Sequence, residues 1–528
     1  MLTGNREMNN LVEDLLYKCG KSQNSPLSTP TGECPWQVFE SIFEAVEKVL
    51  EKQRSTQKYA ASSETFSFEK FMSEERKIDE FKQWMVQASN NNCGLNKYID
   101  LELNTEKSVG LVTCSEIQQD EKVLTIPRKC LIVDECNETP ELESSSDETK
   151  NILKSLFSSS KNLFTEVPSL RLTMVLLFEL FENGSKSNWF HYINVLPRNY
   201  SMLLYFSKST FKSLHAGSAC GELVLSLFRN ISRQYCLIFK NLEKLAPQSN
   251  LANSFSFEAF RWAVCTVMSR QNKLPLKKFS NGVAREQDEL ALIPLWDLAN
   301  HKQSHMTTFY NSETDCVECL ATEKLELGAN FEIHYGNRTN SSFMIYQGFV
   351  PDNNIHNQVS ITLGISSSDV LCRTKSQILL DHQIPSCGKF SLYTAYHEIP
   401  FTRDLLIFLR VFNLDKDDLG LVMIQKELAG KRLLGNLMWA VSQSHEAKTW
   451  KFLSTRCLLL QMKAKKSVSQ TQSTVEDESV SDTAKREANL VLKLLQSELE
   501  VFENVQKFAE RMLKTVQSEP AAFTFLDS

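Results

Sequence analysis

The chain has 528 residues, of which 42% are hydrophobic and 23% charged, a balance typical of a globular protein with more than one domain. A formal net charge of -6 argues against a nucleic-acid-binding protein, which usually carries a basic domain or stripe. No apolar run reaches the roughly 18 residues of a membrane span, and the polar N-terminus lacks the apolar stretch of a signal peptide. These features predict a cytoplasmic protein without a membrane partner, with the nucleus open as a second location.

The N-terminal region, residues 1–79, combines helix and linker. Apolar residues recur at three-to-four spacing from Val38 to Leu50, which predicts an amphipathic helix. Residues 20–35 are rich in Ser, Pro, Thr and Gly and predict a loop, and residues 55–66 predict a linker.

The central region, residues 80–358, alternates between two periodicities. Short apolar runs broken by turns predict strands over about 98–133 and again over about 290–350. Between them the spacing is helical, which predicts a helical insert over about 136–265. The order of strands, helices and strands predicts an α+β core that a helical segment interrupts.

The C-terminal region, residues 359–520, has helical spacing almost throughout, for example at Leu405, Leu406 and Leu409. It is therefore predicted to be an all-helical domain. Within it, residues 463–486 contain almost no apolar side chains, and this composition predicts a disordered loop.

The 14 cysteines are scattered, and the pair Cys316 and Cys319 has the C-x-x-C spacing of a metal ligand pair. A structural zinc site needs four ligands, which usually come from two such pairs. No second pair exists in the sequence, so we expect no bound metal.

Three polar clusters lie close together in the sequence. They are Ser269-Arg270-Gln271-Asn272, the run from Pro294 to His301 that contains Trp296-Asp297, and the run from Glu332 to Asn340 that contains Tyr335-Gly336. Each has an ordinary structural explanation on its own, such as a helix C-terminus at Asn300-His301 or a strand end at Tyr335-Gly336. Their combination is more specific.

An Asn-His pair after a short apolar segment, followed by a Tyr-Gly pair, resembles the C-terminal half of the SET domain. The resemblance implies small β-sheets and a knot-like arrangement of this half, which is rare in proteins. A helical insert and a helical C-terminal domain are similar to the Rubisco large-subunit methyltransferase (LSMT) group. Within that group, segments such as Arg270-Gln271-Asn272 and Phe408-Leu409-Arg410-Val411-Phe412 resemble the actin-histidine N-methyltransferases. The resemblance extends from about residue 80 to beyond 460.

The resemblance implies S-adenosyl-L-methionine as cofactor and transfer of its methyl group to the tele nitrogen of an actin histidine. Ser108, Val109 and Gln347 depart from the residues usual in the family. The residues that correspond to cofactor-binding positions are Lys107, Ser108, Val109, Arg270, Asp297, Asn300, His301, Tyr335 and Gln347.

The resemblance also assigns roles at the reacting atoms. Tyr335 corresponds to the active-site tyrosine, and Asn272 is expected to hydrogen-bond the non-reacting nitrogen of the target imidazole. Trp296 is expected to form a wall of the substrate pocket, and Arg338 to contact the actin segment. Catalysis is thus assigned to Tyr335 and Asn272, and substrate binding to Trp296, Arg338 and Asn272.

Two alternatives stay open at this point. One is a protein-lysine methyltransferase of the same fold, against which the polar Asn272 argues. The other is a non-catalytic adaptor that uses the SET core as a scaffold, against which the intact set of Tyr335, Asn300, His301 and Asn272 argues. Actin is the expected protein partner, nucleic acid is not expected, and the chain is predicted to act as a monomer.

Overall fold

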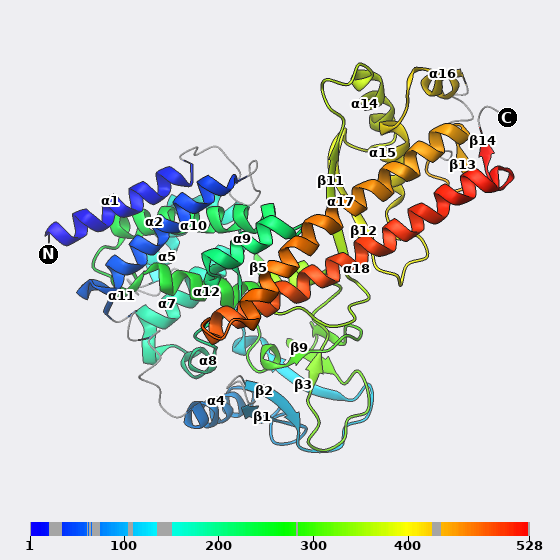
Figure 1. Cartoon of the computed structure of the whole chain (residues 1–528). Helices are drawn as coiled ribbons and strands as arrows, with labels where there is room; N and C mark the ends of the chain where they lie inside the picture. Colours follow the sequence, from blue (N-terminus) through cyan, green and yellow to red (C-terminus); the bar gives the residue numbers. More distant parts are fainter. Residues whose placement is uncertain are drawn as a thin grey trace. The chain divides into compact units, whose positions relative to one another are not determined.

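The computed structural model describes residues 2–20, 34–60, 62, 65, 74–103, 109–134, 150–280, 283–424 and 434–525. The chain divides into two compact units, coloured along the sequence in Figure 1. Unit 1 consists of Met1–Tyr205, Leu225–Gly336 and Tyr346–Gly348, and unit 2 consists of Phe206–Val224, Asn337–Ile345 and Phe349–Ser528. None of the described helices is long and apolar enough to cross a membrane.

Small antiparallel sheets form the β part of unit 1, as expected of the predicted α+β core. The strand order in these sheets is β1-β2, β3-β9-β8 and β4-β6-β5, and a further short parallel pair joins β10 to β7. The strands are β1 (Ile99–Leu103), β2 (Val109–Thr113), β3 (Lys122–Pro127), β4 (Ile132–Val133), β5 (Asn272–Ser280), β6 (Val283–Leu292), β7 (Asn300–His301), β8 (Thr308–Asn311), β9 (Cys316–Leu320) and β10 (Glu332–Ile333).

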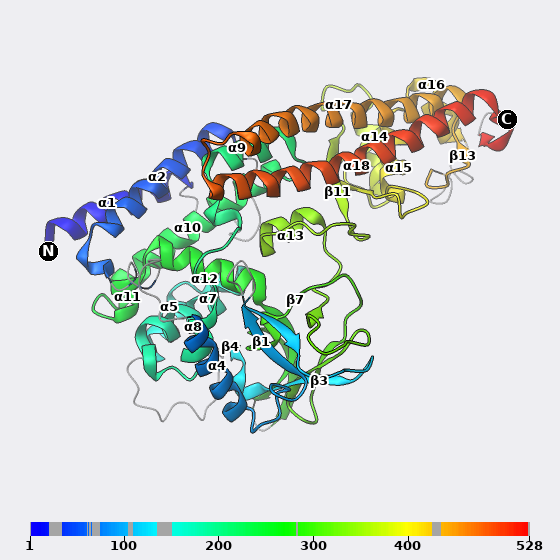
Figure 2. The same cartoon turned by 60° about the horizontal axis from the view of Figure 1, so that its bottom comes forward.

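Helices make up the rest of unit 1, and most of them lie in the chain between β4 and β5, where the sequence predicts the insert. Figure 2 shows this group beside β1, β4 and α4. The helices that belong mainly to unit 1 are α1 (Leu2–Lys18), α2 (Trp36–Arg54), α4 (Glu74–Ala88), α5 (Lys150–Ser159), α6 (Lys161–Glu166), α7 (Ser169–Phe178), α8 (Phe190–Val195), α10 (Gly221–Leu245), α11 (Asn250–Ser254) and α12 (Phe257–Arg270).

The N-terminal helices are packed into unit 1 and do not form a separate region. Phe39 of α2 lies 5.4 Å from Phe228 of α10 between ring centroids. Gln53 donates a 2.7 Å hydrogen bond to the hydroxyl of Tyr235, and Tyr59, in the short 3-10 helix η1 (Gln57–Tyr59), is buried. The linker expected over residues 55–66 is therefore packed structure in its described part.

Unit 2 is mainly helical, but it is not all-helical as predicted. β11 and β12 form an antiparallel hairpin in which Gln358 pairs with Tyr393 and Gly364 with Cys387. In both strands buried and more exposed residues alternate, and this period of two is typical of a sheet with one face on a core. The elements are α9 (Lys208–Gly217), α13 (Asn340–Gln347), β11 (Gln358–Gly364), α14 (Cys372–Asp381), β12 (Cys387–Tyr393), α15 (Arg403–Phe412), α16 (Lys416–Ile424), β13 (Trp439–Ala440), α17 (Gln443–Glu476), α18 (Asp482–Ser518) and β14 (Thr524–Phe525).

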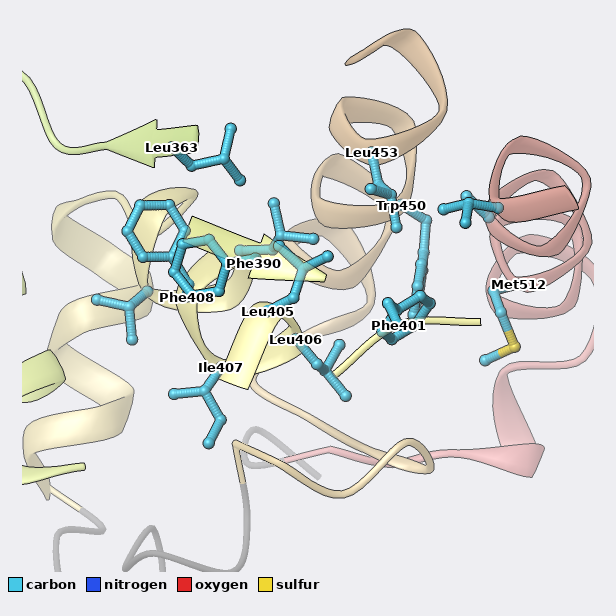
Figure 3. Packing of buried hydrophobic residues seen from close by; sticks show 14 of the residues in the cluster. Leu363, Phe390, Phe401, Leu405, Leu406, Ile407, Phe408, Trp450, Leu453 and Met512 are labelled. Atoms are coloured by element: carbon cyan, nitrogen blue, oxygen red, sulfur yellow. The ribbon is translucent and has the colours of Figure 1, made fainter. Parts of the chain in front are cut away.

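The core of unit 2 lies between this hairpin and the helices α15, α17 and α18 (Figure 3). Phe390 of β12 lies 4.8 Å from Phe408 of α15, and Trp450 of α17 lies 6.0 Å from Phe401, all as centroid distances. Such tilted ring pairs are favourable beyond the apolar area that they bury. The hairpin thus supplies one wall of the core that the sequence assigned to helices alone.

The disordered loop predicted over residues 463–486 is wrong. Residues 463–476 continue α17, and α18 begins at Asp482 after a short turn. Ser481 caps the start of α18 by accepting a hydrogen bond from Ala484 N. Ala464, Ser467 and Thr471 are buried. These residues recur at helical spacing. Ser467 packs so closely on Gly217 of α9 that a Cβ added to Gly217 would lie 2.3 Å from the Cβ of Ser467. Small and polar side chains here serve close helix packing, which a search for apolar residues does not detect.

Carboxylates of α18 hold both ends of α9 within unit 2. Glu487 accepts bonds from Ser207 N at 2.9 Å and from the hydroxyl of Ser207 at 2.7 Å, next to the start of α9. Glu498 accepts bonds from the hydroxyl of Ser218 at 2.8 Å and from Ala219 N at 3.1 Å, just beyond its end. Although α9 lies within the predicted insert in sequence, these bonds attach it to the C-terminal helices.

The fully buried Glu498 is expected to make the stability of unit 2 depend on pH. Burial raises the pKa of its carboxyl from 4.5 to about 7, against the lowering effect of the bonds from Ser218 and Ala219. A pKa raised in the folded state adds stability below pH 4.5 that is lost as the pH rises through about 7. We expect the free energy of unfolding to fall between pH 5 and 8 by on the order of 2 kcal/mol more in the wild type than in Glu498→Gln. Equal pH slopes in urea titrations of the two proteins would contradict this role.

Candidate active site

A pocket in unit 1 is lined by residues that several separate segments of the chain supply. Strand β2 contributes its first residue, and Gly110 next to it lies against Asn300, since a Cβ there would stand 3.4 Å from Asn300 Nδ2. The two strand-rich parts of the sequence therefore meet at this pocket. Its lining residues are Val109, Val195, Pro197, Arg270, Asp297, Leu298, Ala299, Asn300 and Tyr335.

Arg270 reaches the pocket from the last residue of α12. Ser256 caps the start of this helix by accepting a bond from Ala259 N, and most of the helix between the two ends is buried. At position 271 the backbone becomes extended, which ends α12 and leads into β5. A cation at a helix C-terminus is also favoured by the helix dipole.

Asp297 reaches the pocket through a strained turn. Leu295 is fully buried and has φ 71°, in the left-handed region that a branched apolar residue rarely adopts. The short 3-10 helix η7 (Trp296–Leu298) follows, and Asp297 N donates a 3.0 Å bond to Ile293 O. The packed core around Leu295 thus holds the turn that presents Asp297.

Arg270, Asp297 and Tyr192 form a buried polar cluster beside the pocket. Arg270 donates to the backbone carbonyl of Asp297 and lies 3.3 Å from its Oδ1, and the hydroxyl of Tyr192 on α8 donates to its Oδ2. Burial raises the pKa of Asp297 to about 6, although the Arg270 charge and the Tyr192 bond lower it. For Arg270, burial is the largest single effect and lowers the pKa, but Asp297 together with Tyr200, Tyr192 and Tyr335 outweighs it and raises the pKa above its ordinary value. The pair is therefore charged at neutral pH.

Tyr335 is held from two sides by the Ala299-Asn300-His301 segment. Its hydroxyl donates a 2.7 Å bond to Ala299 O, and its backbone N donates a 3.2 Å bond to Nδ1 of His301. The two rings lie 5.1 Å apart between centroids. The parallel pairing of β7 with β10, in which Ile333 lies opposite His301, places the segments side by side. Because His301 Nδ1 accepts a hydrogen bond, it carries no proton in this arrangement.

The pocket brings together five of the predicted cofactor residues: Val109, Arg270, Asp297, Asn300 and Tyr335. His301 adjoins it through the contacts with Tyr335. Gln347 lies at the end of α13 and is not among the lining residues. Lys107 and Ser108 lie outside the described residues.

The predicted substrate residues do not line this pocket. Trp296 is buried and donates its indole N–H to the hydroxyl of Thr308 at 2.9 Å. Asn272 begins β5 and donates from its side-chain amide to Arg270 O at 3.0 Å. Arg338 belongs to unit 2, where its backbone carbonyl accepts a 2.8 Å bond from Asn354. The assignment of these three residues to substrate binding stays a prediction.

Sequence reasoning missed Tyr192, Val195 and Pro197. They lie on or just after α8, within a segment whose helical spacing gives no sign of a polar site. The contact of Tyr192 with Asp297 joins residues far apart in the chain, so no local motif could indicate it. By contrast, the C-x-x-C pair carries no site, because Cys316 and Cys319 are three positions apart on β9 and leave opposite faces of the strand. No cluster of potential metal ligands occurs among the described residues.

Comparison with solved structures identifies the fold. The chain is similar to a structure of Rubisco LSMT bound to sinefungin and monomethyllysine, with TM-score 0.63, 18% identity and coverage of 85% of this chain and 94% of that one. A structure of Rubisco LSMT bound to AdoMet gives TM-score 0.61 at 18% identity, over 83% of this chain and 93% of that one. Residues 366–502 match the family model for Rubisco LSMT substrate-binding. The α+β SET fold with a mainly helical C-terminal region is thereby confirmed.

Comparison with curated proteins identifies the family. The actin-histidine N-methyltransferase of Xenopus tropicalis is 33% identical over 520 residues, which cover 97% of this chain and 81% of that protein. The protein of the same name from Homo sapiens is 32% identical over 508 residues, covering 96% of this chain and 77% of that protein. Such identity over nearly the whole chain confirms the predicted resemblance. The chain belongs to the family of actin-histidine N-methyltransferases.

Proposed function

We propose that this protein transfers a methyl group from S-adenosyl-L-methionine to a ring nitrogen of an actin histidine. The observation that supports the proposal is the pocket at which Arg270, Asp297, Asn300 and Tyr335 converge. The chain that forms this pocket is about one third identical to proteins named actin-histidine N-methyltransferase. When bound, S-adenosylmethionine supplies a methyl group on a positively charged sulfur.

The residues at the pocket fit such a group. The Nε of Arg270 is buried and has no hydrogen-bond partner in the described part of the chain, so a bound acceptor would satisfy it. Asn300 is exposed to the pocket, and its amide offers both a donor and an acceptor to an amino-acid group. Val109, Val195 and Leu298 add apolar surface. These residues would hold the cofactor, with the Arg270–Asp297 pair fixing the wall.

The chain's own contribution to the reaction is then mainly positioning. A histidine side chain has a reference pKa of about 6.5 and is mostly neutral at pH 7, so it needs no strong base before it attacks. It does need one nitrogen without a proton, aimed at the methyl carbon, and orientation of this kind lowers a barrier by several kcal/mol. Tyr335, fixed by Ala299 and His301, presents its ring to the pocket for this purpose. Asn272 is the residue that we assign to the choice of tautomer.

Mass spectrometry of purified actin after incubation with the protein and isotope-labelled S-adenosylmethionine tests the function. We expect one labelled methyl group on one histidine. A matched peptide in which lysine replaces that histidine separates this function from lysine methylation, because it should stay unlabelled. Label on the lysine peptide alone would favour the lysine enzyme, and no cofactor binding in isothermal titration would favour the non-catalytic adaptor.

Tyr192 provides a test of the buried cluster. Tyr192→Phe removes one hydrogen bond to the Asp297 carboxylate, and bonds to charged groups contribute roughly 1.5–3 kcal/mol. Because Asp297 then holds Arg270 less firmly, we expect the dissociation constant for S-adenosylmethionine to rise about tenfold in isothermal titration. Tyr310→Phe, which removes an exposed hydroxyl that donates to Asp315, is the matched control. Equal dissociation constants for the two variants would contradict the proposed positioning.

The proposal also covers where the protein acts in the cell and its assembly state. We propose a cytoplasmic monomer that meets its protein substrate there. Size-exclusion chromatography with light scattering tests the assembly state, and a mass of twice the 60.4 kDa of the chain would overturn it.

A further inference from the structure

Unit 2 contains a second hollow that the proposed chemistry does not use. It is a groove of about 310 Å³ between β11, the end of α15 and the middle of α17. Leu363, Phe412, Phe452 and Leu459 give it apolar walls, and Arg456 is the charged residue among its lining. Both its walls and its floor belong to unit 2.

The aromatic side chains that line the groove are held by packing against one another and against the core. Phe412 and Phe452 lie 4.8 Å apart between ring centroids, and Phe412 stacks in turn on Phe408 of the core. Leu363 is buried and belongs to the same core cluster, as Figure 3 shows. A preformed apolar surface of this kind loses little conformational entropy when a ligand side chain enters it.

The apolar surface continues beyond the groove along α17. Leu459 is 54% exposed, and the neighbouring Leu458 and Met462 are 45% and 60% exposed. Phe452, Leu459 and Met462 recur at helical spacing, so they share one face of the helix. Single exposed leucines are ordinary on protein surfaces, but a contiguous apolar strip next to a groove is typical of an interaction site.

The charge of the groove is unbalanced. The Nε of Arg456 is buried without a hydrogen-bond partner, and within the described residues its guanidinium forms no ion pair. Arg456 thus places one positive charge at an apolar hollow, and a carboxylate from another molecule would satisfy it.

We propose that this groove docks a surface segment of the folded protein substrate in which a bulky apolar side chain stands next to a carboxylate. The apolar side chain packs on Phe412 and Phe452, and the carboxylate binds Arg456, whose planar guanidinium suits a paired contact. Residues 366–502 match a substrate-binding family model, and this range includes all three residues. The inference rests on the proposed function and adds a contact separate from the reacting histidine.

Kinetics on two substrates test the docking. Steady-state methylation is measured with folded actin and with a short peptide around the target histidine, for Leu459→Asp and Arg456→Gln. We expect the ratio of the KM for actin to the KM for the peptide to rise about tenfold in each variant, since removal of one central contact commonly costs this much. Leu380→Asp and Arg373→Gln, on the exposed part of α14, are the matched controls and should keep the wild-type ratio.

The possible outcomes separate the two proposals. A wild-type ratio in both groove variants overturns the docking site and leaves the proposed function intact. Failure of the wild-type enzyme to methylate either substrate overturns the proposed function itself. If Leu459→Asp lowers the melting temperature, Arg456→Gln alone decides, because this change removes a charge without adding one to an apolar surface.

Discussion

Tyr335→Phe is expected to lower the single-turnover rate of histidine methylation about 100-fold, the cost typical of removing one preorganised polar group at a reacting centre. The hydroxyl of Tyr335 is the only part that this change removes, and it donates to Ala299 O at the wall of the pocket. Without it the ring keeps its place beside His301, but the polar atom that it holds at the wall of the pocket is lost. We expect the free energy of unfolding to fall by only about 1 kcal/mol.

A matched control for Tyr335→Phe is Tyr235→Phe. Tyr235 is fully buried, and its hydroxyl accepts a 2.7 Å bond from the side-chain amide of Gln53, but it does not line the pocket. This variant should lose comparable stability and keep most of its rate. An unchanged single-turnover rate in Tyr335→Phe, or equal losses in the two variants, would contradict the role assigned to Tyr335.

The sequence could predict those parts of the site whose residues lie close together in the chain. Asp297, Asn300 and Tyr335 lie in motifs whose residues stay together in the fold, because the pairing of β7 with β10 joins the two segments directly. Tyr192 lay beyond such reasoning, since it meets Asp297 only through the packing of α8. Asn272 shows the converse limit: the motif that contains it was recognised, but in the structure its amide bonds Arg270 O and it does not line the pocket.

The fold followed the sequence where apolar spacing decided the structure. The helix around Phe39 and Val49 and the strands between residues 98 and 133 formed as predicted. The prediction was wrong at residues 463–486, because small side chains such as Ser467 stabilise α17 through close approach to Gly217 and not through apolar burial. The β11–β12 hairpin was missed for a different reason. Its two short strands lie in a part of the chain whose other apolar residues have helical spacing, so their period of two was not recognised. In the structure their buried residues pack on the helices of unit 2.

Arg410→Met is expected to lower the free energy of unfolding of unit 2 by about 4 kcal/mol, the cost typical of breaking a buried ion pair by removing one partner. Arg410 and Glu446 are both fully buried, and the guanidinium binds the carboxylate at 2.9 Å and 2.7 Å. The same guanidinium donates to Leu434 O, Asn436 O and Leu437 O. Methionine would fill the space but leave a buried carboxylate and three carbonyls without this donor. The loss of unfolding free energy is measured by urea unfolding, followed with a probe in unit 2 such as the buried Trp450.

A double variant separates the charge from the carbonyl bonds. Adding Glu446→Gln to Arg410→Met removes the uncompensated negative charge, so we expect it to restore about 2 kcal/mol. Full recovery is not expected, because Leu434 O, Asn436 O and Leu437 O, which join the chain between α16 and α17 to α15, would still lack this donor. Recovery to wild-type stability would mean that the ion pair alone matters. No recovery would mean that Arg410 stabilises unit 2 chiefly through these backbone bonds.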